Sequence, residues 1–472
     1  MLTHWIANQP RPSTRAGRGI AVIDPATEAA LEQVPDEPAI VDEAVGAAYA
    51  AFGHWSRLEP TLRRDLLVQA SDRLLQTKEV IVDLHIQETG KTREQALAEI
   101  GGAAVAVRSM ADLGVYIQAG AEQSAGGELL FQYREPRGVA ACIVPWNYPI
   151  VTAAENIAAN LVMGNTIVLK PSEKTPMATR AMAEVAFAHL PDGVCNVVLG
   201  GGNVGARLIE DPRIELIVFV GSPGVGRTIS ALAAPTFKKL VLELGGKDAM
   251  IVDETVNPRE AARLAAECVF VNVGQICTST ERIYVTREAY QEFVDALVDE
   301  STAYVPGDSR VESATLGPLI DHGQLERVET QVRAAVDRGA RLLRGGKRLA
   351  RNGFFYPPTV LTDVPPDTRL MCEETFGPVA PVAAVDSFEE AIDRANDTRY
   401  GLAAVVCTDS AERAIQAIQN LRVGMVKVNA PRGRVAQSTS EPSGISGVGH
   451  GYGIEYLCEI TRQKSVHWRS RP

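Results

Sequence analysis

The run VAACIV (139–144) opens the part of the sequence that decides the fold. Four similar apolar runs follow it: TIVLK (166–170), VCNVVL (194–199), LIVFV (216–220) and KLVLEL (239–244). Helix-prone segments separate these runs, and this alternation is typical of a parallel, doubly wound sheet. Ligands of such sheets bind beyond the carboxyl ends of the strands. We therefore expect an α/β protein whose binding site lies at the ends of these strands.

The region before this section has a helical pattern. After a short strand and turn at 19–28, the helical segments cover 41–52, 62–76, 79–88 and 92–123. None of these segments carries obvious chemistry.

Two strand-like segments lie apart from the rest. Residues 129–134 alternate like an exposed strand after a Gly-Gly turn, and 464–468 resemble a strand near the end of the chain. A second α/β pattern fills 247–430. A strand placed between a helical and an α/β section predicts an arm that pairs with another segment.

Length, charge and cysteine usage narrow the class of protein. A chain of 472 residues is expected to form two or three domains. A net charge of −11 argues against nucleic-acid and anionic-membrane partners, and no apolar run reaches the roughly 18 residues that span a bilayer. The N-terminus has no apolar signal core, and the seven cysteines contain no CxxC pair. We expect a cytoplasmic protein without disulfides.

The segment GQICTST (274–280) holds the candidate nucleophile, Cys277. A cysteine after a helix-prone run (261–270) and before a strand-like one (282–285) can be buried filler, since free Cys is among the most buried residue types. Two segments upstream favour a chemical role instead, LELGGK (242–247) and PWNYP (145–149).

Together these segments resemble the signature set of the NAD(P)-dependent aldehyde dehydrogenases. The resemblance runs in the family's order from IDPAT (23–27) to the tail beyond Val466. It implies an aldehyde dehydrogenase-like α/β fold, with a Rossmann-type cofactor domain, an α/β catalytic domain and a β-arm for oligomerisation.

The resemblance also implies domain boundaries and an assembly. The NAD-binding domain would comprise 1–117 and 138–245, and the catalytic domain 246–434. The oligomerisation arm and C-terminal tail would comprise 118–137 and 435–472. The expected assembly is a homodimer or a homotetramer.

By the same resemblance, three residues carry the reaction. The Cys277 thiolate attacks the aldehyde, and Asn147 stabilises the oxyanion together with the Cys277 N–H. Hydride transfer leaves a thioester, which a water activated by Glu243 hydrolyses to a carboxylate. The structural alternatives are a surface ion pair with Lys247 for Glu243 and a turn role for Asn147.

Three segments are expected to hold the cofactor, NAD. In KPSE (170–173) the resemblance places Lys170, Ser172 and Glu173 at the adenosine ribose, where Glu173 would repel the 2′-phosphate of NADP. In GSPGVG (221–226) backbone N–H groups and a helix N-terminus could cradle a phosphate, although a tight βα turn would look the same. In EETFGP (373–378) Glu374 would contact the nicotinamide ribose and Phe376 would pack near the ring. Further expected cofactor contacts are Trp146, Gly202, Gly205, Phe219, Gly221, Ser222 and Gly245. Generic dinucleotide-fold reasoning would instead place Glu243 on the ribose.

The histidines show no HxxxH or HxH spacing, so no metal is expected.

The C-terminal segment EPSGISGVGH (441–450) departs from the family pattern. It looks shortened, lacks the usual aromatic residue and lysine, and has His450 where Arg is usual. Because this segment helps to shape the substrate mouth, it leaves the choice of aldehyde open. The GQICTSTER segment resembles the branch that acts on aromatic aldehydes, whereas Arg432 and Arg434 could select an anionic semialdehyde or be solvated surface charges. We favour a hydrophobic or aromatic aldehyde.

Other classes of function remain as alternatives. A thiol with a carboxylate could serve a cysteine-dependent esterase or thioesterase, but no motif places a His beside Cys277. A non-catalytic homologue would not need Asn147, Glu243 and Cys277. A CoA-acylating relative would usually lack the base that Glu243 provides.

Overall fold

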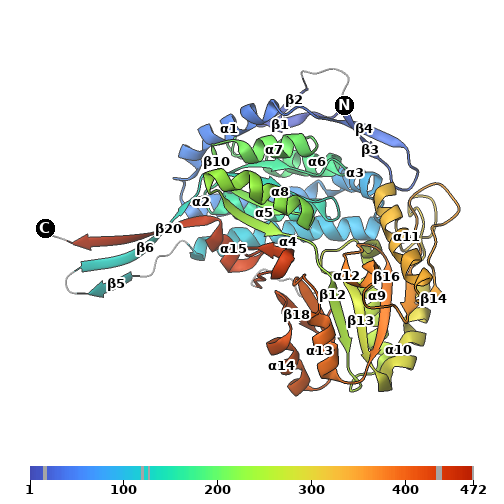
Figure 1. The fold of residues 1–472 in the computed structure, drawn as a ribbon. Coiled ribbons are helices and arrows are strands. Elements are labelled where there is room, and N and C mark those ends of the chain that lie inside the picture. The colour runs from blue at the N-terminus through green and yellow to red at the C-terminus, as the bar shows by residue number, and fades with distance from the viewer. Residues whose placement is uncertain (14–18, 118–121, 126–127, 432–437, 470–472) are drawn as a thin grey trace.

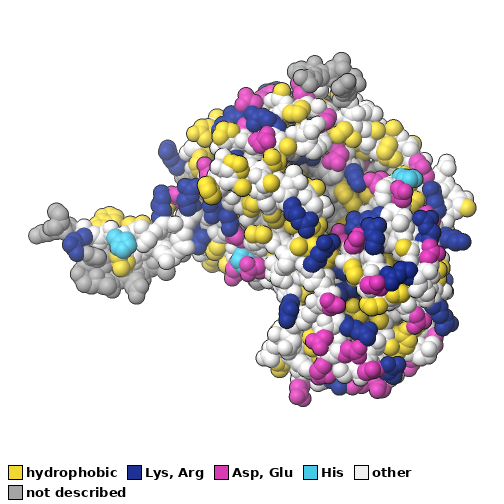
Figure 2. Space-filling model, viewed as in Figure 1, with side chains coloured by type: hydrophobic (Ala, Val, Ile, Leu, Met, Phe, Trp, Pro, Cys, Tyr) yellow, Lys and Arg dark blue, Asp and Glu magenta, His cyan; other side chains and the backbone are white. Residues whose placement is uncertain are grey.

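The protein is described by a computed structural model covering residues 1–13, 19–117, 122–125, 128–431 and 438–469. Figure 1 shows two α/β lobes and a β-sheet arm that projects from the larger lobe. Each lobe is built around its own sheet. On the face shown in Figure 2, acidic and basic side chains are interspersed over the smaller lobe.

The larger sheet has eight strands among the described residues. In spatial order they are β19 (Gly447–Val448), β11 (Lys239–Glu243), β10 (Ile214–Val220), β7 (Val139–Ile143), β8 (Thr166–Lys170), β9 (Cys195–Val197), β1 (His4–Ile6) and β2 (Gln9–Arg11). The five strands predicted from the apolar runs form its parallel centre, and β1, β2 and β19 are antiparallel additions. The chain moves from β7 outward through β8 and β9, and then returns to β10 on the other side of β7. The strand order therefore reverses between β7 and β10, which is where such sheets bind ligands.

Helices cover both faces of this sheet. They are α1 (Ile40–Trp55), α2 (Pro60–Gln76), α3 (Lys78–Thr89), α4 (Arg93–Ile117), α5 (Pro149–Val162), α6 (Pro176–Phe187), α7 (Gly202–Glu210) and α8 (Pro223–Ala233). Successive side chains of β7 point to opposite faces of the sheet and so enter two different cores. Ala140 and Cys142 join the core under α2 to α6, whereas Val139 and Ala141 join the core under α1, α7 and α8. A strand buried on both faces reads as a continuous apolar run, as the sequence does.

The predicted helix at 92–123 is wrong at its C-terminal end. Helix α4 ends at Ile117, and Glu122–Ala125 form strand β5. Pairing of β5 with the neighbouring β6 replaces helical hydrogen bonds. By length and composition α4 is the one helix in the described part of the chain that could span a membrane. It packs between α2 and α5 and supplies Ile100, Val107 and other residues to the larger core.

The smaller sheet has seven strands among the described residues. In spatial order they are β14 (Arg341–Arg344), β15 (Thr359–Thr362), β16 (Val379–Val385), β13 (Thr280–Thr286), β12 (Asp248–Val252), β17 (Ala403–Cys407) and β18 (Met425–Val428). Its helices are α9 (Pro258–Phe270), α10 (Arg287–Glu300), α11 (His322–Asp337), α12 (Arg369–Cys372), α13 (Phe388–Asn396) and α14 (Ala411–Asn420). The second α/β pattern of the sequence is therefore confirmed.

The arm is a three-stranded antiparallel sheet. It contains β5, β6 (Glu128–Pro136) and β20 (Thr461–Arg469), with β6 in the middle. The two strand-like segments of the sequence thus pair with each other. Before β20 the tail forms α15 (Gly453–Glu459), which packs against α4, and β19, which joins the larger sheet beside β11. The short strand and turn near the N-terminus form the hairpin of β3 (Gly19–Ile23) and β4 (Ala30–Pro35).

Candidate active site

Cys277 lies in a strained loop between α9 and β13. The loop passes through left-handed backbone at Asn272 (φ 52°), Val273 (φ 59°) and Gly274 (φ 69°). A β-branched residue in this region is a genuine outlier, and such strain collects at functional sites. Gly274 is required here because a Cβ would lie 2.2 Å from the main-chain oxygen of Gly377.

The exposure of Cys277 separates it from the buried cysteines. Its thiol is in no disulfide and is partly exposed, whereas Cys142, Cys195 and Cys407 are buried. Burial raises the pKa of Cys142 to about 12 and that of Cys407 to about 12. Those thiols are inert filler, and Cys277 does not share their surroundings.

Gln275 fixes this loop through its side chain and connects it to Asn147 through its main chain. The Gln275 Oε1 accepts a hydrogen bond from the Ile320 N–H (2.9 Å), and the Gln275 main-chain oxygen accepts one from Asn147 Nδ2 (3.0 Å). Asn272 Nδ2 donates to the main-chain oxygens of both Asn147 (3.3 Å) and Gln275 (3.1 Å). Asn147 is buried and lies 128 residues before Gln275 in the sequence, yet it contacts Gln275, which is only two residues before Cys277. A role in the local turn alone does not account for this contact.

A buried charge cluster holds the start of the helix that follows Asn147. Glu99 Oε1 accepts hydrogen bonds from the N–H groups of Ile150 (2.9 Å) and Val151 (3.3 Å), in the first turn of α5. Its other oxygen accepts from Lys91, whose Nζ lies 3.8 Å from the centre of the Tyr148 ring. A carboxylate at a helix N-terminus is favourable, and this one fixes the position of the Asn147 loop.

Glu243 ends strand β11 at the same edge of the sheet. Its main-chain oxygen accepts a hydrogen bond from the Gly221 N–H (3.0 Å), which connects it to the loop after β10. Lys247 is not its surface partner. Lys247 is buried, and its Nζ donates to Glu281 Oε2 (2.7 Å) and Thr375 Oγ1 (3.0 Å).

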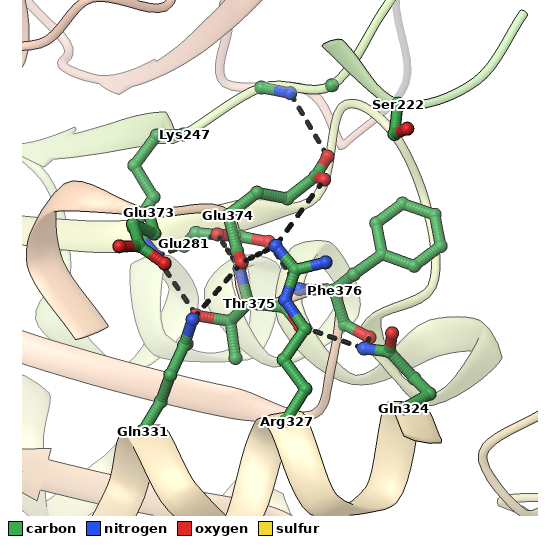
Figure 3. A network of polar contacts seen from close by, with 12 residues as sticks. Ser222, Lys247, Glu281, Gln324, Arg327, Gln331, Glu373, Glu374, Thr375 and Phe376 are labelled. Atoms are coloured by element: carbon green, nitrogen blue, oxygen red, sulfur yellow. Dashed lines mark hydrogen bonds and ion pairs between the residues drawn. The ribbon is translucent and has the colours of Figure 1, made fainter. Parts of the chain in front are cut away.

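Glu281 supports the turn that carries Glu374 and Phe376. Its two carboxylate oxygens accept hydrogen bonds from the N–H groups of Thr375 and Phe376, both at 2.8 Å. Figure 3 shows Gln324, Arg327 and Gln331 reaching this turn from one helix, α11. All three donate to main-chain oxygens of residues 374–376. Glu281 was missed in the sequence, although a carboxylate directly before the strand-like run 282–285 was a usable signal.

The Glu374 carboxylate faces the glycines after Glu243. Its Oε1 accepts a hydrogen bond from the Gly246 N–H (3.2 Å), and a Cβ on Gly245 would lie 2.3 Å from the same oxygen. Burial, with repulsion from Glu281, raises the pKa of Glu374 to about 7. The structure thus brings together Gly245 and Glu374, two residues of the predicted cofactor site.

The two aromatic residues that are expected to contact the cofactor, Trp146 and Phe376, lie against each other. The rings of Trp146 and Phe376 are 5.3 Å apart, edge to face at 81°, and Lys174 Nζ lies 5.3 Å from the centre of the Trp146 ring. Phe376 has left-handed backbone (φ 56°). Trp146 and Asn147 therefore stand between the Cys277 loop and the Glu374 turn.

The KPSE segment lies at the end of β8. Lys170 is buried, which lowers its pKa, and its Nζ donates to the main-chain oxygen of Pro171 (3.1 Å) with Glu173 Oε2 at 3.8 Å. The Ser172 hydroxyl accepts from the Lys174 N–H (3.3 Å). A Cβ on Gly205 would lie 3.7 Å from Lys170 Cδ, so the start of α7, at Gly202, faces this lysine.

The loop after β10 fits a phosphate. Ser222 caps α8, accepting a hydrogen bond from the Val225 N–H (3.4 Å), and Pro223 occupies the first turn. Gly221 is required because a Cβ would lie 2.4 Å from the Phe219 ring. The first N–H groups of an α-helix favour an anion, which suits a dinucleotide pyrophosphate.

Within the described ranges, no group of three or more His, Cys, Asp and Glu side chains could hold a metal ion. Arg432 and Arg434 lie outside the described residues.

The fold and this site define a class of enzyme. A parallel sheet with an anion-binding helix N-terminus at its switch point is joined to a second α/β lobe, which presents a partly exposed cysteine beside a buried amide. That is the architecture of a dinucleotide-dependent enzyme with a thiol nucleophile.

Comparisons with known proteins agree with this class. The aldehyde dehydrogenase family profile matches residues 12–466. The chain is 36% identical over 461 residues to the mitochondrial aldehyde dehydrogenase of Leishmania tarentolae, covering 97% of this chain and 93% of that protein. It is also 36% identical over 461 residues to lactaldehyde dehydrogenase of Escherichia coli K12, covering 97% and 96%. Its identity to the D-glyceraldehyde dehydrogenase (NADP(+)) of Picrophilus torridus is 33% over 455 residues, covering 94% and 92%.

Solved structures are similar over nearly the whole chain. The crystal structure of E. coli lactaldehyde dehydrogenase superposes with a TM-score of 0.96 at 35% identity, covering 99% of both chains. Betaine aldehyde dehydrogenase of Staphylococcus aureus, in complex with NAD+, superposes with a TM-score of 0.95 at 29% identity, covering 100% of this chain and 95% of that one. The chain belongs to the aldehyde dehydrogenase family, whose members are oxidoreductases that act on aldehydes with NAD or NADP.

Proposed function

We propose that this enzyme oxidises a hydrophobic or aromatic aldehyde to the carboxylate, with NAD as the hydride acceptor. The Cys277 thiolate adds to the carbonyl carbon, and the oxyanion so formed accepts hydrogen bonds from Asn147 Nδ2 and the Cys277 N–H. Loss of hydride converts this adduct to a thioester on Cys277. Glu243 takes a proton from a water, which attacks the thioester and releases the carboxylate and the thiol.

The observation that carries this proposal is the contact between Asn147 and the Cys277 loop. Asn147 Nδ2 lies 3.0 Å from the main-chain oxygen of Gln275, two residues before the candidate nucleophile. Glu99 holds the start of the helix after Asn147, and the Asn272 amide donates to the Asn147 main chain. The Asn147 side-chain amide is therefore fixed in advance as a donor to an oxyanion at Cys277.

Residues around the switch point suit the cofactor. The α8 N-terminus with Ser222 would hold the pyrophosphate, Lys170 and Glu173 the adenosine ribose, and Glu374 with Phe376 the nicotinamide side. When bound, the nicotinamide supplies a hydride acceptor. The Glu173 carboxylate favours NAD, because it would repel the 2′-phosphate of NADP. Relatives are named with each cofactor, so this preference needs a direct test.

The domain roles and the assembly are part of the proposal. Residues 1–117 and 138–245 would bind NAD, and 246–434 would carry the nucleophile. The arm and tail, 118–137 and 435–472, would form contacts between copies in a homodimer or homotetramer. In support, the arm projects from the body in Figure 1, and its outer strands, β5 and β20, present sheet edges. All seven cysteines lie in the described part of the chain and none of them forms a disulfide, which supports the reducing cytoplasm.

The test is NADH formation with a panel of aliphatic, aromatic and carboxylated aldehydes. Wild type should reduce NAD fastest with an aromatic or hydrophobic aldehyde, and Cys277→Ala should not reduce it. A carboxylated semialdehyde as the best substrate would establish the anionic alternative. Aldehyde-dependent NADH from Cys277→Ala, or ester hydrolysis without any NADH from wild type, would overturn the proposal.

A further inference from the structure

The C-terminal segment, which departs from the family pattern, runs directly along the strand that carries Glu243. Strand β19 pairs with β11 in antiparallel register, with Gly447 opposite Glu243 and Val448 opposite Leu242. The Leu244 N–H donates to the main-chain oxygen of Ser446 (2.8 Å). The tail is therefore a wall of the site beside Glu243, and not a remote appendage.

The end of this segment is held by an ion-pair cluster. Glu459, at the end of α15, accepts hydrogen bonds from the His450 N–H (2.6 Å) and lies 2.9 Å from His450 Nδ1. Its other oxygen accepts from Lys239 Nζ (2.5 Å), at the start of β11. The Gly451 N–H donates to the main-chain oxygen of Ser440 (3.2 Å). The 450–451 peptide is therefore fixed relative to β11.

The Glu243 carboxylate occupies the place that a side chain at position 451 would fill. A Cβ on Gly451 would lie 1.2 Å from Glu243 Oε1, 2.2 Å from its Cδ and 2.8 Å from its Cγ. The backbone of Gly451 is not in the left-handed region, so its conformation does not require glycine. A side chain at position 451 would therefore displace the carboxylate of Glu243 from its present place.

The tail also contributes a second contact region on this side of Glu243. Tyr456, on α15, is buried and its hydroxyl donates to Asn156 Oδ1 (2.5 Å). Burial, and then the charges of Cys142, Glu155 and Glu243, raise the pKa of Tyr456. The Glu243 side chain is therefore close to both Gly451 and the α15 helix.

We propose that Gly451 is a positioning residue for the general base, because the missing side chain lets the Glu243 carboxylate lie against the 450–451 peptide and activate water from there. This inference rests on the proposed role of Glu243. The C-terminal segment, whose sequence differs from the family pattern, then has a function. Through Gly451, which the His450–Glu459–Lys239 cluster holds in place, this segment sets the position of the Glu243 carboxylate.

The test variant is Gly451→Ala. The three atoms nearest to the added methyl all belong to the movable end of the Glu243 side chain, and the backbone of Gly451 is outside the left-handed region, so the protein should fold. The matched control is Gly53→Ala in α1, where a Cβ would meet nothing within 4 Å. Kinetics would be measured with the best aldehyde of the panel. The enzymes compared are wild type, Gly451→Ala, Glu243→Gln, Gly53→Ala and the double variant Gly451→Ala/Glu243→Gln.

We expect kcat of Gly451→Ala to fall by about 10- to 100-fold, a large part of the roughly 100- to 10,000-fold that a positioned base contributes. One equivalent of NADH per site should still form in a rapid burst, because thiolate attack and hydride loss do not need Glu243. The double variant should be no slower than Glu243→Gln alone, and Gly53→Ala should match wild type. Unchanged kcat, loss of the burst, or a double variant slower than Glu243→Gln would each overturn the proposal.

A crystal structure of Gly451→Ala separates this inference from the proposed function. We expect the Glu243 carboxylate to leave its position beside residue 451, whatever reaction the enzyme catalyses. If wild type forms no NADH but the carboxylate moves, the proposed function fails and the positioning contact stands. If the carboxylate stays and the 450–451 backbone moves instead, the positioning role is wrong.

Discussion

The side-chain amide of Asn147 donates a hydrogen bond to the main-chain oxygen of Gln275 at 3.0 Å, across 128 residues of sequence. This contact joins the end of β7 in the larger lobe to the Cys277 loop of the smaller lobe. The two candidate catalytic residues, Asn147 and Cys277, thus come from different lobes, so the packing of the lobes sets how close they lie.

Replacing this donor should slow the chemical step. Asn147→Ala should lower kcat/KM for the aldehyde by about 100- to 1000-fold, the usual cost of losing one oxyanion donor. The measurement is steady-state NADH formation at saturating NAD. Asn420→Ala, which removes an exposed amide that donates within α14, is the control and should match wild type. Equal activity of Asn147→Ala and wild type would show that the oxyanion is held elsewhere.

The buried pair of Lys247 and Glu281 should matter for stability and for the cofactor site. Glu281→Gln leaves the buried ammonium of Lys247 without its carboxylate, which should cost about 3–5 kcal/mol in the free energy of unfolding. It also loosens the Glu374 turn, so KM for NAD should rise. Urea unfolding and NAD titration test both effects.

The control for that variant is an exposed ion pair. Glu292→Gln breaks the surface contact with Arg259 and should change stability by no more than about 1 kcal/mol. If Glu281→Gln behaves like Glu292→Gln in both measurements, the buried pair does not support the turn.

Cofactor choice should depend on Glu173. In Glu173→Gln the repulsion of a 2′-phosphate is removed, so kcat/KM with NADP should rise by about 10-fold or more relative to kcat/KM with NAD. Two unit charges about 4 Å apart near a protein surface interact by roughly 1–4 kcal/mol, which is enough for this change. The measurement compares both cofactors in wild type and variant. Glu184→Gln, on the exposed side of α6, should leave the ratio unchanged. The same ratio in Glu173→Gln as in wild type would move the selecting group elsewhere.

Stability should fall with rising pH because of Glu88. This buried carboxyl accepts from the N–H groups of Met177 and Ala178 at the start of α6, and burial raises its pKa to about 8 from an ordinary 4.5. The native state therefore binds this proton more tightly than the unfolded chain. The stabilising contribution is complete below about pH 4.5 and is lost as pH rises toward 8.

The comparison that isolates this group is wild type against Glu88→Gln. Between pH 5 and 8 the free energy of unfolding of wild type should decline relative to the variant, by at most about 1.4 kcal/mol per pH unit. Thermal or urea unfolding across this range provides the measurement. Parallel pH profiles for the two proteins would mean that Glu88 titrates normally.

The sequence predicted most of the larger sheet, because apolar runs are local patterns. The run VAACIV becomes β7, and Asn147 follows it within a few residues, so its place after a strand end could be read directly. The pairing of Asn147 with Cys277 came from the family resemblance, and their catalytic roles stay predictions. The error at the end of α4 arose because Glu122–Ala125 follow a tertiary pairing with β6, which overrides helical propensity.

The residues that were missed act over long separations. Glu281 meets Lys247 and the N–H groups of Thr375 and Phe376, and no spacing in the sequence specifies that meeting. Gly451 looks like one of several glycines in the tail, and only the folded structure brings the Glu243 carboxylate against it. Such contacts follow from how the lobes and the tail pack.

The most direct test of the account is to trap the intermediate on Cys277. Glu243→Gln, mixed with NAD and the best aldehyde, should form one equivalent of NADH per site and then stop. Mass spectrometry of the peptide that contains Cys277 should show the acyl group derived from that aldehyde. NADH formation with this peptide unmodified, or with the acyl group on another cysteine such as Cys372, would contradict the account.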